Sequence, residues 1–351
     1  MTPTGARSRL DWVDTARGAS ILLVVMYHAG LFAASVGLTS NPWNLVNGAA
    51  QVLRMPLFFF LSGLLATRAV ERPWRILLRG RIGTNLYLYV LWASAAFLLF
   101  TLIPYGREGA PRGPWHWVES TFLLPENGTW YLLTLALFIV TARLLRAVPT
   151  TALLGVAAVV STVAGTGLVE DSFVWNNCLV LFVFFAAGVR LPSATLRTST
   201  TLGRPRVALP LVVVVGGASL LAAHRGWMDV AGVRTLLGAA AVVTGIAVSV
   251  LIARTAAGRL LARLGRDTLA VYVTHEMLLA VLVLPLAGLA GSSWTDAARW
   301  AAPVILIVAG TAAAVALRGP LSQVPWVLRT PGRSTVPTSS TSTPASAVVD
   351  A

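Results

Sequence analysis

The chain has 351 residues, of which 56% are hydrophobic and 11% are charged, and its formal net charge at pH 7 is +14. This amount of apolar surface excludes a soluble globular domain and predicts an all-α polytopic membrane protein. All 27 basic residues are arginine. Their distribution is explained by membrane topology, so the charge does not require a nucleic-acid partner.

Apolar windows long enough to cross a bilayer predict a bundle of about ten transmembrane helices. The predicted spans are residues 18–38, 48–67, 84–103, 130–145, 150–168, 174–190, 207–223, 235–253, 268–289 and 300–317. The fourth span is short, and the preceding segment 114–130 is predicted to form an interfacial or re-entrant piece. No connection is long enough for a large soluble domain, so the chemistry is expected within the bundle or at its mouths.

The charged residues predict how the bundle is oriented. With the N-terminus inside, most arginines fall on the cytoplasmic side and most acidic residues fall outside, so both termini are predicted to be cytoplasmic. Residues 1–320 are predicted to form one transmembrane domain. Residues 321–351 are expected to be a disordered cytoplasmic tail, because the composition turns to Ser, Thr, Pro and Ala. The single cysteine, Cys178, is expected to be an inert filler of an apolar run.

The first predicted span carries the clearest sign of chemistry. Arg17 and His28 are eleven residues apart, so on an α-helix they share a face and lie roughly 16 Å apart along the axis. Asp14 precedes Arg17 by three residues and falls on the same face. Ionisable side chains are costly in hydrocarbon, so this line of residues is expected to mark a functional site. The alternative is a histidine that only hydrogen-bonds between helices.

The second span contains Arg54 near its outer end and the pair Ser62 and Gly63 in its inner half. The Arg54 side chain is expected either to snorkel to the interface or to reach the bundle interior. Ser62 and Gly63 are expected to let two helices approach closely, which is the usual reason for small residues in membrane helices. No Gly-x-Ser-x-Gly sequence surrounds Ser62, so a hydrolase nucleophile is not expected there.

The connection between the second and third spans is strongly basic. One interpretation is membrane topology alone. The other is a surface that binds phosphate groups, since the arginine guanidinium donates planar, bidentate hydrogen bonds. The two interpretations are compatible. The candidate phosphate-binding residues are Arg72, Arg75, Arg79 and Arg81.

The ninth span contains Tyr272, His275 and Glu276. Two neighbouring titratable side chains inside a span predict a functional role, and a buried polar clamp between helices is the alternative. Measured from the predicted cytoplasmic end of the span, both lie in its inner half. Direct contact of these side chains with the atom on which His28 acts is therefore not expected. No spacing of His, Cys, Asp or Glu resembles a metal site, so no metal is expected.

Several of these segments resemble the acyltransferase-3 superfamily of integral-membrane acyltransferases. The resemblance includes the first-helix signature with its Arg-to-His spacing, the second-helix motif, an Arg-x-x-Arg element and two later patterns. One departure is Asn85, which stands where members of the family often have proline. The segments that carry the resemblance are RLDWVDTARG at 9–18 leading to His28, FFLSG at 59–63, RPWR at 72–75, WYL at 130–132 and VYVTH at 271–275.

The resemblance implies a membrane-embedded acyltransferase. Such an enzyme takes an acyl group, usually acetyl from cytoplasmic acetyl-CoA, and passes it to a hydroxyl of a glycan, a lipid-linked acceptor or a secreted small molecule. The implied location is a bacterial plasma membrane. His28 and Arg17 match residues that the family treats as essential, and Asp14 lies in the same signature.

The chemistry of the residues agrees with this implication. Acyl transfer from a thioester needs a base or a nucleophile near the carbonyl, and histidine serves either task. The four arginines of the basic connection are expected to hold the coenzyme phosphates, and Arg17 to orient the pantetheine arm. The residues expected to support the reaction are Ser62, Tyr272, His275 and Glu276.

Two other function classes stay open at this point. A secondary transporter of a small anionic or sugar-like substrate also has many spans with buried ionisable residues, but no internal repeat is evident here. Such a transporter would accumulate its substrate without coenzyme. A noncatalytic membrane scaffold would not need the alignment of Arg17 with His28.

Overall fold

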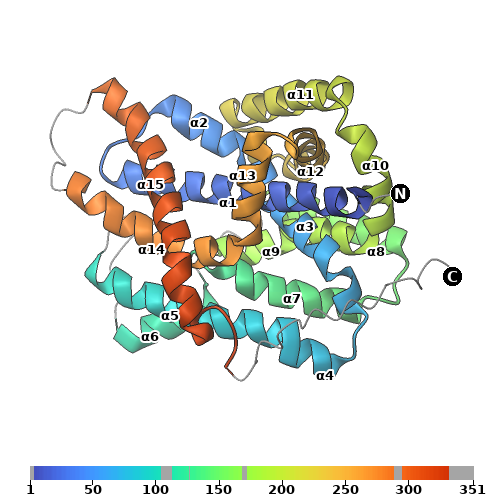
Figure 1. Ribbon diagram of the computed structural model, residues 1–351, viewed down its shortest axis with the longest axis horizontal. Coiled ribbons are helices and arrows are strands. Elements are labelled where there is room, and N and C mark those ends of the chain that lie inside the picture. Colours follow the sequence, from blue (N-terminus) through green and yellow to red (C-terminus); the bar gives the residue numbers. More distant parts are fainter. Residues whose placement is uncertain (1–3, 104–112, 126, 168–171, 288–294, 332–351) are drawn as a thin grey trace.

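The structure, a computed structural model, describes residues 4–103, 113–125, 127–167, 172–287 and 295–331. Every regular element within these residues is helical (Figure 1). The elements are α1 (Thr4–Ser35), α2 (Asn41–Ala49), α3 (Gln51–Val70), α4 (Trp74–Leu77), η1 (Leu78–Ile82), α5 (Gly83–Leu102), α6 (Gly113–Val118), η2 (Glu119–Leu123), α7 (Trp130–Leu144), α8 (Thr150–Ala164), α9 (Phe173–Arg190), α10 (Pro192–Leu202), α11 (Pro205–His224), η3 (Trp227–Asp229), α12 (Val233–Ile252), α13 (Ala256–Arg266), α14 (Thr268–Ala287), α15 (Asp296–Gln323) and η4 (Pro325–Val327).

The helices account for the apolar windows of the sequence. In the described part of the chain, eight helical segments are long and apolar enough to cross a membrane, and α7 and α8 are shorter apolar helices. The prediction of an all-helical polytopic membrane protein is thereby confirmed. Ten crossings and the cytoplasmic position of both termini stay predictions. The helices that overlap the predicted spans are α1, α3, α5, α7, α8, α9, α11, α12, α14 and α15.

Helix α1 runs through the middle of the bundle (Figure 1). It packs most extensively on α13 and also contacts α2, α3, α12, α14 and α15. The start of α1 and the last turns of α15 lie at the same end of the bundle, because both helices contact the α13–α14 junction there. The basic connection between α3 and α5 lies at that end as well, which is called the arginine-rich end below.

The basic connection between α3 and α5 is helical. α4 and η1 follow one another, and the backbone leaves helical geometry only at Gly80 (φ −94°, ψ −111°). The reason is an amphipathic pattern, since the apolar Leu77 and Ile82 are buried between arginines that remain exposed.

The ordered part of the chain extends past the expected domain boundary at residue 320. α15 continues to Gln323, and η4 then packs against α5. There the Tyr87 hydroxyl donates to the Trp326 carbonyl at 2.9 Å, and Trp92 Nε1 donates to the Val327 carbonyl at 2.8 Å. These hydrogen bonds and the apolar side chains around them explain why residues 321–331 do not behave as the expected tail. The rest of that tail, residues 332–351, lies outside the described residues.

Helices α3 and α9 meet through glycines. A Cβ atom on Gly63 would collide with the Phe185 carbonyl oxygen, and one on Gly188 would collide with the Phe60 carbonyl oxygen. The backbones therefore approach more closely than any larger residue permits, as expected for the small residues after Ser62. Because α3 carries Arg54 and Ser62, this contact fixes the wall of the candidate site.

Replacing Gly188 with alanine is expected to destabilise the protein by about 1–3 kcal/mol, because the added methyl group meets main-chain atoms that cannot rotate away. The thermal unfolding midpoint of the detergent-purified protein should fall accordingly. Gly216 in α11 has open space around it and is the matched control, so Gly216→Ala should leave the midpoint unchanged or higher. Equal midpoints for the two variants would contradict the close packing of α3 on α9.

Candidate functional site

The first candidate residue, His28, is in direct contact with His275. Nε2 of His275 lies 3.2 Å from Nδ1 of His28, and the ring centroids are 4.8 Å apart in an edge-to-face arrangement. His275 is fully buried, with 0% of its surface exposed, whereas His28 is partly exposed to a cavity. The two histidines found separately in the sequence therefore form one pair between α1 and α14.

The depths of the two histidines along their helices are consistent with this contact. Arg17 Nη2 donates to Thr268 Oγ1 at 2.8 Å, so Arg17 and the first residue of α14 are level. His28 lies eleven residues after Arg17 in α1, and His275 lies seven residues after Thr268 in α14. At the rise of an α-helix, the two histidines therefore differ in depth by about 6 Å. Two imidazole side chains span that distance. His275 contacts His28 itself, and the expectation that His275 does not contact the atom on which His28 acts stays a prediction.

The hydrogen bonds of the pair assign its tautomers. His275 Nδ1 lies 2.6 Å from the Tyr272 carbonyl, and His28 Nδ1 lies 3.0 Å from the Val24 carbonyl. A carbonyl only accepts, so each Nδ1 carries a hydrogen. In the neutral pair, His28 Nδ1–H is shared between the Val24 carbonyl and the Nε2 lone pair of His275. The lone pair of His28 is then on its Nε2, the nitrogen that a general base would use.

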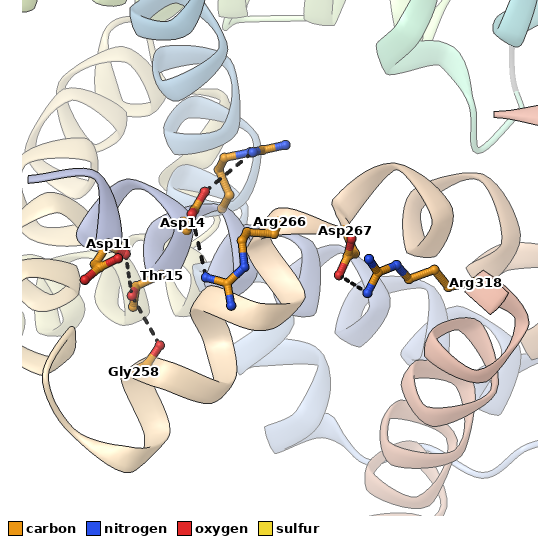
Figure 2. Close-up of polar contacts among 8 residues, drawn as sticks. Asp11, Asp14, Thr15, Gly258, Arg266, Asp267 and Arg318 are labelled. Atoms are coloured by element: carbon orange, nitrogen blue, oxygen red, sulfur yellow. Dashed lines mark hydrogen bonds and ion pairs between the residues drawn. The ribbon is translucent and has the colours of Figure 1, made fainter. Parts of the chain in front are cut away.

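Arg17 and Asp14 lie at the arginine-rich end and do not contact His28. Asp14 is 3.7 Å from Arg17 and 3.9 Å from Arg266 of α13, and Figure 2 shows Asp14 facing Arg266. Asp267 is paired with Arg318 of α15 at 2.6 Å. In the described structure the contacts of Asp14 are those of a residue that positions Arg17, and a catalytic role for Asp14 stays a prediction.

Helices α1 and α13 are held together beside these ion pairs. The Thr15 hydroxyl lies 2.9 Å from the Asp11 carbonyl and 3.2 Å from the Gly258 carbonyl (Figure 2). Cβ atoms on Gly18 or Gly265 would collide with the facing backbone. This tight contact sets the depth at which Arg17 sits relative to α14.

The supporting residues form two further contacts. The Tyr131 hydroxyl lies 2.5 Å from Ser62 Oγ, which also lies 2.8 Å from the Phe58 carbonyl. Since the Phe58 carbonyl can only accept, the Ser62 hydroxyl donates to it. Ser62 Oγ in turn accepts a hydrogen bond from the Tyr131 hydroxyl. The expectation that Ser62 is not a nucleophile stays a prediction. The Tyr272 hydroxyl accepts from the Tyr131 backbone N–H at 3.0 Å, which links α14 to α7.

Glu276 points to the other end of the bundle from Arg17. Its Oε2 accepts from the backbone N–H of Gly128 at 2.8 Å, in the turn before α7. A Cβ atom on Gly128 would collide with this carboxylate. Glu276 therefore joins α14 to the turn that begins α7. It is the ninth of the twenty residues of α14, and its position in the inner half of the span stays a prediction.

The four candidate phosphate-binding arginines are exposed at the arginine-rich end. Among the described residues, none of their side chains forms an ion pair with a carboxylate. Arg81 is close enough to Arg72 and to Tyr131 for electrostatic interaction, so it faces both the surface and the region of Ser62. The arrangement is open to an anion, and coenzyme binding by these residues stays a prediction.

A cavity of about 860 Å³ lies at the opposite end of the bundle. It is bounded by the C-terminal half of α1, by α2, by the first turns of α3, α9 and α12, and by the turn before α7. Arg17 and the four arginines do not line it. Its polar lining residues include His28, Asn47, Gln51, Arg54, Asn127, Asn177, Arg234, Tyr272 and Glu276.

The sequence did not single out several residues of this cavity. His116 had no assigned role, yet it lines the cavity, with its Nδ1 3.8 Å from a Glu119 carboxylate oxygen. Asn177 lies one turn inside the apolar helix α9, and Arg234 is the second residue of the apolar helix α12. A polar residue in such a place is itself a signal. Of the two alternatives for Arg54, snorkelling to the interface or reaching the bundle interior, the structure shows the second, because the side chain is only 6% exposed.

No group of acidic, histidine and cysteine residues that could hold a metal occurs in the described part of the chain.

A comparison with protein families agrees with the motifs and with the helical architecture. The family model described as acyltransferase domain, that of acyltransferase-3, matches residues 10–319. The chain belongs to the acyltransferase-3 family. No curated protein and no solved structure matches it significantly. The match covers every helix from α1 to α15, so the His28–His275 pair and the cavity both belong to the acyltransferase-3 domain of a multi-pass membrane protein.

Proposed function

We propose that this acyltransferase-3 protein transfers an acetyl group from acetyl-CoA to a hydroxyl of a glycan, lipid-linked or secreted small-molecule acceptor. The coenzyme binds at the arginine-rich end and the acceptor enters the cavity at the other end. The observation that carries the proposal is the position of His28. Its ring borders the cavity, and its Nδ1–H is held by the Val24 carbonyl and by His275.

In the proposed reaction, His28 Nε2 takes the proton of the acceptor hydroxyl as the hydroxyl oxygen bonds to the thioester carbonyl carbon. The C–S bond then breaks, the ester forms, and the coenzyme thiolate receives the proton from His28. His275 stabilises the imidazolium intermediate, because the Nε2 lone pair of His275 accepts from His28 Nδ1–H. A thioester bound at the arginine-rich end reaches His28 only if the side chains between Arg17 and Val24 move apart, since no residue of α1 before Val24 lines the cavity.

The direct test is transfer by the purified protein in liposomes. With acetyl-CoA supplied on the side of the arginine-rich end, we expect thiol release coupled to formation of an acetyl ester on a hydroxyl acceptor. Thiol release and ester should appear in equal amounts. Uptake of an acceptor-like solute without coenzyme, and without any ester, would contradict the proposal and identify a transporter.

Changing Arg72 and Arg75 together to glutamine is expected to raise the KM for acetyl-CoA about 10-fold or more, because two charge-assisted hydrogen bonds to phosphate are lost. The KM for the acceptor should stay nearly unchanged. Initial rates measured against each substrate in turn check this. Arg197 is an exposed arginine of α10 and gives the matched control, since Arg197→Gln should change neither constant. An equal rise for both substrates would argue against a donor site on this surface.

A further inference from the structure

The cavity contains a second charged centre besides His28. Arg54 lies in the first turns of α3 and borders the cavity, although 94% of its surface is covered. The guanidinium carbon lies 4.4 Å from the centroid of the Tyr27 ring, and that ring is 5.1 Å from the His28 ring. Arg54, Tyr27 and His28 therefore form one continuous part of the cavity wall.

The contacts of Arg54 leave its charge without a counter-ion. Its Nη2 donates to the Asn47 carbonyl at 3.0 Å and to Asn47 Oδ1 at 2.7 Å. Its Nε is buried and has no hydrogen-bond partner. None of the ion pairs found among the described residues includes Arg54.

A buried guanidinium without a carboxylate partner has an unfavourable desolvation free energy. Removing an arginine from water costs several kcal/mol, and neutral amide acceptors with an aromatic face offset only part of that cost. Helix α2, which supplies Asn47, and the Tyr27 ring hold the guanidinium in one orientation. The missing component is an anion on the cavity side.

The charges around the cavity point to the same conclusion. The described lining residues include two arginines, Arg54 and Arg234, and one carboxylate, Glu276. Glu276 is already engaged by the backbone N–H of Gly128. A cavity wall with an excess of positive charge attracts anionic ligands.

We propose that the acceptor carries an acidic group, a carboxylate or a phosphate ester, and that Arg54 binds this group while the acceptor hydroxyl faces His28. The inference rests on the proposed function for the statement that the ligand is an acceptor. The anion site itself rests on the geometry of Arg54. The ring-to-ring distances through Tyr27 place both groups within the reach of a single sugar-sized molecule.

The experiment measures binding without acetyl-CoA, so that it is independent of transfer. Glucose, glucuronate and glucose 6-phosphate differ only at one carbon and are titrated calorimetrically into the purified protein. A separate arm compares thermal stability in phosphatidylcholine nanodiscs with and without phosphatidic acid. Binding of the two soluble acids identifies a soluble acidic acceptor, whereas stabilisation by phosphatidic acid alone identifies a lipid-linked phosphate.

Three variants define the site. Arg54→Gln should weaken binding of the acidic probe about 10- to 100-fold, the effect of losing a hydrogen bond between charged groups. Arg54→Lys keeps the charge without the planar fork and should weaken it less. Arg225 is exposed at the same end of the bundle but does not line the cavity, so Arg225→Gln should bind as the unaltered protein does.

The proposal is overturned if neither acidic probe class binds more tightly than its neutral counterpart to the unaltered protein. It is also overturned if Arg54→Gln, folded as judged by its unfolding midpoint, retains the preference for acids. Binding of acids without any transfer would instead overturn the acyltransferase assignment and leave the anion site intact. Transfer to neutral acceptors alone would overturn the anion site and leave the acyltransferase assignment intact.

Discussion

Replacing His28 with asparagine is expected to lower kcat for acyl transfer by at least about 10²-fold, the usual contribution of a general base. The amide of asparagine cannot take a proton near neutral pH, although it can still hydrogen-bond to the Val24 carbonyl. The measurement is ester formation by the reconstituted protein at saturating acetyl-CoA. Because the imidazole borders the cavity and is not in the fully buried core, the variant should insert and fold.

His224 provides the matched control for this experiment. It is an exposed histidine at the end of α11 and does not line the cavity, so His224→Asn should transfer at the unaltered rate. If folded His28→Asn kept most of its activity, another group would have to be the base.

Removing the His275 acceptor is expected to lower kcat about 10- to 100-fold, the range seen when a partner that orients a reacting group is lost. The loss should be smaller than for His28→Asn, because the Val24 carbonyl still holds His28 Nδ1–H. His275→Leu removes the acceptor, while His275→Gln places an amide oxygen near the position of Nε2. The glutamine variant should therefore recover most of the lost rate.

Separate kinetic constants distinguish this positioning role from a general loss of structure. In His275→Leu we expect kcat to fall while the KM for acetyl-CoA stays constant, because the arginines proposed to hold the donor lie at the other end of the bundle. If the leucine and glutamine variants were both as inactive as His28→Asn and still folded, α14 would carry a catalytic group of its own.

The membrane architecture and the family were readable from the sequence because each rests on local pattern. Apolar runs of sufficient length predicted where helices occur, and every predicted span coincides with a helix. The signature at residues 9–18 with His28 and the later motifs predicted the acyltransferase-3 family, which the match to residues 10–319 confirms. The line from Asp14 through Arg17 to His28 follows from helical period alone.

The relative depth and the contacts of different helices could not be predicted from local sequence pattern. The depth of His275 depends on how α14 sits against α1, and this is set by the glycine contacts of α1 with α13 and by the Arg17–Thr268 hydrogen bond. The choice between snorkelling and burial for Arg54 depended on Asn47 and Tyr27, which belong to other helices.

By itself, then, the sequence determined the long apolar helices, the family and the individual ionisable residues, because these follow from period, composition and local motif. Only the tertiary structure decided that His28 and His275 form a pair, that Glu276 bonds to the turn before α7, and that Arg54 borders the cavity beside them. The physical reason is that helical period specifies an angle about one axis. The register and tilt of one helix against another come from close packing and from hydrogen bonds between residues distant in the chain.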